Sequence, residues 1–105
     1  MTDATYLPMP DADELELSKV LEALADPVRL QIVAALAAGE RPCGSFPLPV
    51  GDPTRSHHLR ILREAGVTRT RVSGTQRLVS LRRDDLERRF PGLLDSVLAA
   101  SAAAA

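Results

Sequence analysis

Aromatic residues are scarce in this 105-residue sequence, which has no tryptophan, one tyrosine and two phenylalanines. Sandwiches and barrels are rich in aromatic and β-branched strand residues, so this shortage favours a mainly helical fold with a core of Leu, Val, Ile and Ala. Cys43 is the single cysteine, which excludes an internal disulfide. There is no apolar run of about 18 residues and no secretory leader, so we expect a cytoplasmic protein without a membrane span.

Catalytic motifs are also missing. The sequence has no glycine-rich phosphate loop, no nucleophile elbow and no convergent pair of carboxylates. We therefore expect a binding protein that needs no cofactor rather than an enzyme. The length is that of a single domain, which we place at residues 13–101, between a flexible N-terminal arm at residues 1–12 and a frayed alanine tail at residues 102–105.

The formal net charge of −1 conceals a segregation of charge along the chain. Residues 1–26 carry seven acidic side chains and one lysine, whereas residues 54–83 carry eight arginines and one glutamate. A polyanion would be attracted to the second segment and repelled by the first. Double-stranded DNA is therefore the partner that this charge pattern favours.

Residues 52–66 are predicted to form a short helix with a signal at each end. Asp52 is suited to cap the first amides, Pro53 fits the first turn, and Gly66 fits the left-handed position after the last turn. At about 100° per residue, Leu59 and Leu62 fall on one side of the helix and polar residues on the other. The candidate DNA-binding residues here are Thr54, Arg55, Ser56, His57, His58 and Arg60. An ordinary solvated face is the alternative interpretation of this pattern.

Two further helices are predicted to precede this one. From Asp13 on, apolar residues recur at helical spacing for about 13 residues. Asp26 and Pro27 then end the first helix and begin the second, as its cap and its first-turn residue. The second helix continues to Gly39 with an apolar stripe that comprises Leu30, Val33, Leu36 and Ala37.

These segments resemble a known family. Residues 21–36 read LEALADPVRLQIVAAL, which resembles the opening signature of the ArsR/SmtB family of bacterial winged-helix repressors. Residues 56–66, SHHLRILREAG, look like the recognition helix of that family. The two segments have the family's order and about its spacing, and the resemblance covers roughly residues 13–98. It implies a winged helix-turn-helix fold and a dimeric, effector-responsive transcriptional regulator. The family usually has an apolar residue at the position of Arg55, whose angle also places it near the packed side.

The segment from Gly39 to Gly51 departs from the family pattern. The family has a regular helix here, whereas this sequence contains Pro42, Gly44, Pro47 and Pro49. An interior proline removes an N–H donor and clashes with the preceding turn, at a cost of about 3 kcal/mol. We therefore expect a single turn or an irregular loop, with apolar contacts to the neighbouring helices from Phe46, Leu48 and Val50.

Residues 67–81 are predicted to form a β-hairpin with Ser73 and Gly74 at its turn. Such a short hairpin must pack against helices to be stable, as the wing of a winged helix does. We expect its polar side chains to contact a phosphate backbone or a minor groove, and the candidates are Arg69, Arg71, Gln76 and Arg77. The alternative is an edge hairpin that uses charge to avoid aggregation.

Residues 82–105 contain a last helical region, which Pro91 and Gly92 divide. A small monomer cannot bury both the apolar stripe of this region and that of the first helix. We therefore expect a homodimer through the first and last helices, which the family resemblance also implies. The predicted interface residues are Leu17, Val20, Leu21, Leu24, Leu93, Leu94, Val97 and Leu98.

The sequence offers few ligands for a metal ion. His57 and His58 point about 100° apart on a helix, so they do not converge on one ion. Metal-sensing family members use a Cys-x-Cys near the position of Cys43, or His and carboxylate ligands on the last helix. This chain has one cysteine in the first region and no histidine in the second. We therefore expect no metal site.

The sequence leaves the input signal open. Cys43 is interpreted as a structural or merely tolerated thiol, with a redox switch as the alternative. A small apolar ligand between the helices and a separate sensor protein are the other candidates. The competing functional class is a winged-helix module that binds another protein instead of DNA.

Overall fold

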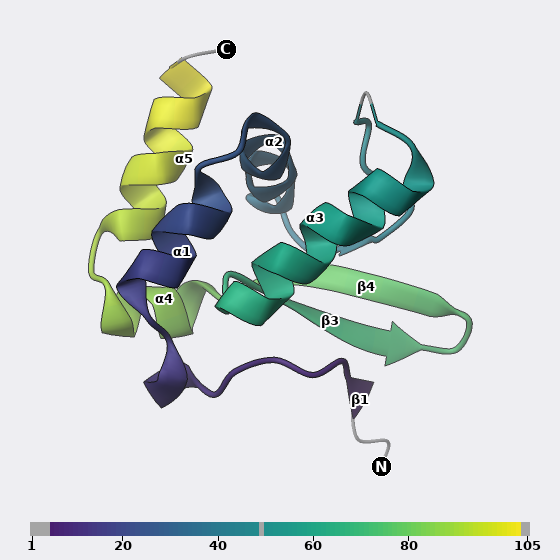
Figure 1. Cartoon of the computed structure of the whole chain (residues 1–105), viewed down its shortest axis with the longest axis horizontal. Coiled ribbons are helices and arrows are strands. Elements are labelled where there is room, and N and C mark those ends of the chain that lie inside the picture. Colours follow the sequence, from purple (N-terminus) through teal and green to yellow (C-terminus); the bar gives the residue numbers. More distant parts are fainter. Residues whose placement is uncertain (1–4, 49, 104–105) are drawn as a thin grey trace.

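The computed structural model describes residues 5–48 and 50–103, which form helices packed around a small antiparallel sheet (Figure 1). The helices are α1 (Leu17–Leu24), α2 (Pro27–Leu36), α3 (Asp52–Ala65), α4 (Arg83–Arg89) and α5 (Leu93–Ala103). The strands are β1 (Thr5–Tyr6), β2 (Arg41–Pro42), β3 (Thr68–Ser73) and β4 (Gln76–Leu81). Within the described residues, none of these helices is long and apolar enough to cross a membrane.

The helix ends largely follow the local signals. The side chain of Asp26 accepts hydrogen bonds from the amides of Val28 and Arg29 at the start of α2, as predicted. Gly66 has a φ of 88° and ends α3 in the left-handed conformation, which is also as predicted. Asp52, however, is the first residue of α3, and Gly51 occupies the cap position.

The first helix is shorter than predicted. A 3-10 turn at Ala12–Glu14 precedes α1, and Leu15 follows this turn with extended backbone. The apolar period from Asp13 onward therefore spans two short elements, the 3-10 turn and α1. Leu15 lies between them and is buried although it belongs to neither.

The predicted hairpin is confirmed, with a different turn. Ser73 pairs with Gln76, so the two turn residues are Gly74 and Thr75 rather than Ser73 and Gly74. Gly74 has a φ of 61°, the left-handed conformation that glycine adopts readily. The sheet is wider than a hairpin, since the strand order is β1-β3-β4-β2 with antiparallel pairing throughout.

The proline-rich segment between α2 and α3 is irregular, as predicted. It contains the short strand β2, where Arg41 pairs with Val79, and a turn at residues 43–44, but no helix over its described residues. Phe46 is buried and Leu48 packs against the core. The expected apolar contacts are therefore present for Phe46 and Leu48, whereas Val50 is half-buried and is not part of the core cluster. Pro49 lies outside the described residues.

Residues 5–10 lie along the sheet instead of extending away as the expected flexible arm. Thr5 pairs with Val72 and Tyr6 with Arg71, and the amide of Leu7 donates to the carbonyl of Thr70 at 2.9 Å. Helical or alternating apolar periods do not reveal such a strand, because backbone groups make these bonds. Residues 1–4 of the arm and 104–105 of the tail lie outside the described residues.

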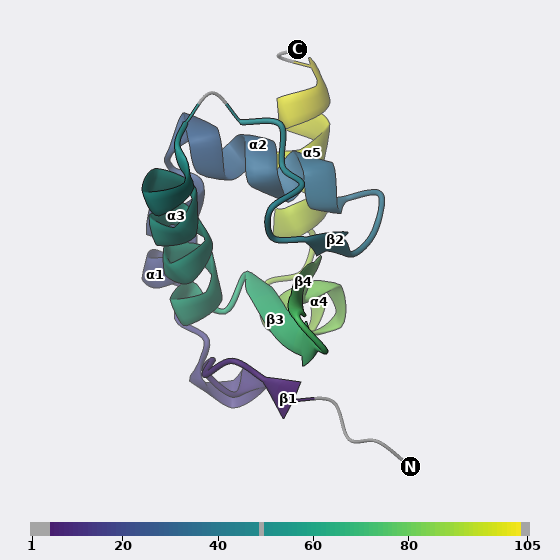
Figure 2. The same ribbon diagram turned by 90° about the vertical axis from the view of Figure 1, so that its right-hand side faces the viewer.

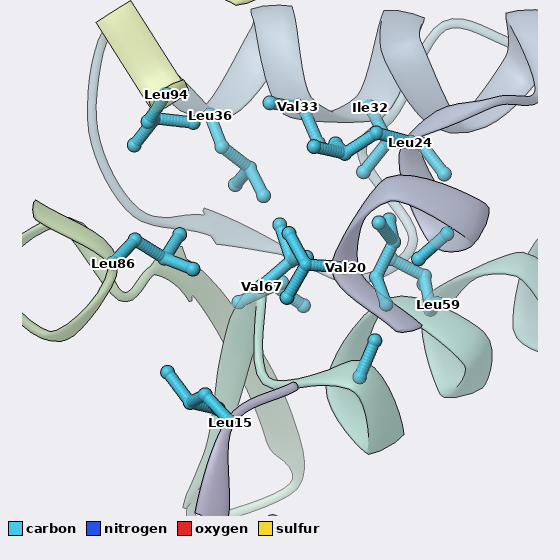
Figure 3. Packing of buried hydrophobic residues seen from close by; sticks show 14 of the residues in the cluster. Leu15, Val20, Leu24, Ile32, Val33, Leu36, Leu59, Val67, Leu86 and Leu94 are labelled. Carbon is cyan, nitrogen blue, oxygen red and sulfur yellow. The ribbon is translucent and has the colours of Figure 1, made fainter. Parts of the chain in front are cut away.

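The core lies between α1, α2, α3 and the inner face of the sheet (Figure 3). Val20 is 0% exposed, and Leu24 and Leu94 are also buried. These three residues were predicted at the dimer interface, and this assignment is corrected because their side chains pack inside the monomer. The other predicted interface residues are exposed or half-buried, namely Leu17, Leu21, Leu93, Val97 and Leu98.

Candidate nucleic-acid interface

The outward face of α3 carries most of the polar residues that the sequence predicts for it. Thr54, Ser56, His57 and Arg60 are exposed, whereas Leu59 and Leu62 are buried. Figure 2 shows α3 at the edge of the molecule, with α1 and α2 behind it and the sheet below. The predicted division of this helix into a packed side and a free side is thus correct.

Two predicted residues of α3 are not free. His58 is 9% exposed, and its Nδ1 lies 3.1 Å from Nη1 of Arg29 in α2. It is therefore removed from the candidate DNA contacts, because its ring is occupied inside the protein. Arg55 is half-buried and forms an ion pair with Asp52, in agreement with the angle that places it near the packed side.

Two of the three hairpin arginines are also engaged elsewhere. Nε and Nη2 of Arg71 each lie 2.8 Å from a carboxylate oxygen of Glu40, and these hydrogen bonds lower the pKa of Glu40. Nη2 of Arg69 lies 3.5 Å from a carboxylate oxygen of Asp85 in α4. The prediction that Arg69 and Arg71 are free to contact DNA is therefore corrected. Both side chains instead form ion pairs that connect the hairpin to neighbouring segments.

The remaining hairpin candidates, Gln76 and Arg77, are exposed beside the turn. Directly paired residues share a face of the sheet, and successive residues alternate. Arg77 pairs with Val72, two residues after the buried Thr70, so Arg77 lies on the face that α3 covers. Arg69 and Arg71 occupy the opposite face, which explains why they meet other partners.

A groove of about 360 Å³ runs between α3 and the sheet. We call it the basic groove, and its polar lining comprises Ser56, His57, Arg60, Arg63, Thr70 and Arg77, with Cys43 beside them. The sequence prediction did not include Arg63, although its position three residues after Arg60 puts it on the same face of the helix. Nε of Arg63 donates to the carbonyl of Pro8 at 3.2 Å, so the N-terminal segment borders the groove.

The described part of the chain contains no group of three or more His, Cys, Asp or Glu side chains that is placed to hold a metal ion. Cys43 is half-buried on the sheet side of the groove. The two histidines diverge, with one in the groove and the other against α2. The chemistry of the groove is therefore that of hydrogen-bond donors and positive charge, which suits phosphate and base edges.

Comparison with known proteins identifies the relatives of this chain, although no family model matches it. It is 32% identical to the uncharacterised HTH-type transcriptional regulator YceK of Bacillus subtilis over 97 residues, which are 89% of this chain and 97% of that protein. It is 35% identical to the arsenical resistance operon repressor of Staphylococcus xylosus, over 69% of this chain and 71% of the repressor. The chain belongs to the ArsR/SmtB family of winged helix-turn-helix transcriptional regulators.

A solved structure of the family agrees with this assignment. The crystal structure of the transcriptional repressor BigR from Xylella fastidiosa matches with a TM-score of 0.64 and 30% identity, over 80% of this chain and 84% of BigR. In the terms of the family, α3 is the recognition helix and β3–β4 is the wing. The chain is therefore a transcriptional regulator and not an enzyme.

Proposed function

We propose that this chain is a homodimeric repressor that binds a specific operator in double-stranded DNA. The observation that carries the proposal is the basic groove, in which Arg60 and Arg63 of α3 lie near Arg77 of the wing. None of the described residues that line the groove is acidic. The arsenical resistance operon repressor and BigR are both named as repressors, which supports a repressing rather than an activating role.

The contacts divide into two kinds under this proposal. The recognition helix enters the major groove, where Thr54, Ser56 and His57 reach base edges and discriminate between sequences. Arg60 and Arg77 contact phosphates or the minor groove and contribute affinity on every sequence. The half-sites lie one helical turn apart, at about 34–36 Å, because two-fold symmetry of the protein is mirrored in the DNA.

Exposed apolar side chains on α1 support the dimer. Leu17 and Leu21 are 47% and 46% exposed on the same side of the helix. Leu93, Val97 and Leu98 of α5 are half-buried. Figure 1 shows α1 and α5 on the side of the molecule opposite the wing tip, and Figure 2 shows them at different depths, with α1 next to α3 and α5 farther from it. A second copy on this side would leave the basic groove open.

Binding to selected and random duplexes tests the proposal. An operator is first selected from a random double-stranded pool, and affinity is then measured against salt by fluorescence anisotropy. Each phosphate contact releases counterions from the DNA, so Arg60→Ala and Arg77→Ala should each weaken binding to both duplexes. Each variant should also make the slope of log binding constant against log salt concentration less steep by about 1. His57→Ala should weaken binding to the selected duplex more than to the random one.

Arg88→Ala is the matched control. Arg88 is an exposed arginine on α4, which lies at the end of the wing opposite its tip (Figure 1). This variant should keep both the affinity and the salt slope of the wild type. Salt-independent binding, or equal losses from Arg77→Ala and Arg88→Ala, would contradict the proposed DNA surface.

A further inference from the structure

Arg29, near the start of α2, connects α2 to two other helices. Its Nε lies 2.6 Å from the carbonyl oxygen of Ala23, and its Nη2 lies 3.4 Å from that of Glu22, both at the end of α1. The carbonyls at the C-terminal end of a helix carry partial negative charge, so a cation is favourable there. The third nitrogen, Nη1, lies 3.1 Å from Nδ1 of His58 in the recognition helix. Arg29 thereby joins α1, α2 and α3.

This contact determines which nitrogen of a neutral His58 ring carries the proton. Every nitrogen of a guanidinium is a donor and none is an acceptor. Nδ1 of His58 must therefore accept the hydrogen bond, and the neutral ring carries its proton on Nε2. A second proton on Nδ1 would remove the hydrogen bond and place two cations 3.1 Å apart in a partly buried contact.

The surrounding charged groups do not supply His58 with an alternative hydrogen-bond acceptor. Asp26, at the start of α2, is the acidic group on that side, and its carboxylate accepts from the amides of Val28 and Arg29. These hydrogen bonds, with that from the Arg29 amide first, lower the pKa of Asp26, and the nearby positive charges of Arg29 and of a protonated His58 lower it further. Lys19 and Glu22 of α1 line the adjacent hollow together with Arg29 and with Glu64 of α3.

We propose that His58 is a positioning residue whose neutral form holds the recognition helix in its DNA-binding orientation, so that protonation of His58 weakens DNA binding. His57 acts in the opposite sense, because a proton on this exposed ring adds positive charge in the basic groove. These are the only two histidines of the sequence, and histidine is the side chain that ordinarily changes charge between about pH 5 and 8. The inference rests on the DNA binding proposed above.

Paired histidine variants separate the two effects. His57→Gln removes the titrating group from the groove, and in this background the affinity for the selected duplex should fall about tenfold once acidification at constant salt, with the protein still folded, protonates His58 and breaks its contact with Arg29. In His57→Gln with His58→Asn, the same acidification should change affinity less than about twofold. The Oδ1 atom of asparagine keeps an acceptor near the position of Nδ1 but is not protonated by this acidification.

A measurement on the free wild-type protein tests His58 without DNA. Nitrogen-15 NMR of the imidazoles should show neutral His58 with its proton on Nε2. Circular dichroism before and after acidification checks that each variant is folded. If His58→Asn does not fold, Arg29→Lys is used in its place. Lysine keeps the positive charge but cannot bind the α1 carbonyls and His58 together. The effect of pH on DNA affinity in the His57→Gln background should again become smaller.

Two results would overturn the inference about His58. One is an Nδ1-protonated ring in the neutral protein, and the other is equal pH dependence with and without His58→Asn or Arg29→Lys. If the wild type binds no DNA at any pH, the proposed function fails instead, and the NMR result still decides whether His58 accepts from Arg29.

Discussion

Adjacent or similar residues of this protein have different environments and therefore different roles. His57 lines the basic groove while His58 contacts Arg29, because neighbours on a helix point about 100° apart. Arg71 is paired with Glu40 while Arg77 is exposed, because the two side chains lie on opposite faces of the sheet. The direction of a side chain thus decides its role, in addition to its chemistry.

Gly66 is the residue at which we expect the largest effect of a single added methyl group. Its φ is 88°, and an added Cβ would lie 2.0 Å from Cδ2 of the buried Leu15. Gly66→Ala should lower the free energy of unfolding by about 3 kcal/mol, from the left-handed backbone and the overpacking together. Urea denaturation measures this loss.

Gly44→Ala is the control for that measurement. Gly44 has no atom within 4 Å of an added Cβ, and it is not among the glycines with positive φ. Its substitution should change the free energy of unfolding by less than about 0.5 kcal/mol. Similar losses in the two variants would show that the packing of Leu15 on Gly66 is not a source of stability.

Among the secondary-structure elements, β1 is a third strand beside the β3–β4 wing, and it connects the wing to the helices. It covers the free edge of β3, and the carbonyls just after it accept from Arg63 of α3 and Arg82, which precedes α4. An uncovered strand edge exposes unpaired backbone groups to solvent and to other chains. The N-terminal segment should therefore restrain the wing relative to the recognition helix.

Deletion of residues 1–9 tests this role of β1. Because the deletion removes the partners of the β3 edge, the β3 amides that face β1 should exchange with deuterium at least about tenfold faster. Tyr6→Ala is the matched control, since it removes an exposed side chain and keeps the backbone pairing with Arg71. Unchanged exchange after the deletion would contradict a stabilising role for this strand.

For the whole molecule, the main consequence of the fold is the proposed dimer. Four residues of α1 were expected at the dimer interface. Val20 and Leu24 are buried inside the monomer, so only the exposed Leu17 and Leu21 remain available for contact with a second copy. Since Val20 and Leu24 already fill the monomer core, the monomer does not need the second copy to bury α1. A folded monomer should therefore be accessible by substitution.

Leu21→Glu should dissociate the dimer without unfolding the chain. The new carboxylate would be buried without a partner at the interface, which costs several kcal/mol and corresponds to a loss of more than about 100-fold in dimer affinity. Sedimentation velocity at micromolar concentration, with circular dichroism to verify folding, measures both properties. Lys19→Glu, on the side of α1 that borders α3, should remain dimeric. A dimeric Leu21→Glu protein would refute an interface through α1.

The sequence by itself determined the features that depend on neighbouring residues. Asp26 and Pro27 define the start of α2, and Gly66 defines the end of α3, because caps and turns are made by residues within a few positions of each other. The helical period likewise identified the packed and free sides of the recognition helix. The prolines between α2 and α3 excluded a regular helix there for the same local reason.

Only the tertiary structure decided which polar residues remain free to bind. His58 meets Arg29 across 29 positions of sequence, and Arg71 meets Glu40 across 31. The pairing of β1 with β3 and the burial of Val20 and Leu24 are equally nonlocal. Residue type and period do not specify such partners, because a charged or apolar side chain has the same local signature whether a distant segment covers it or leaves it exposed.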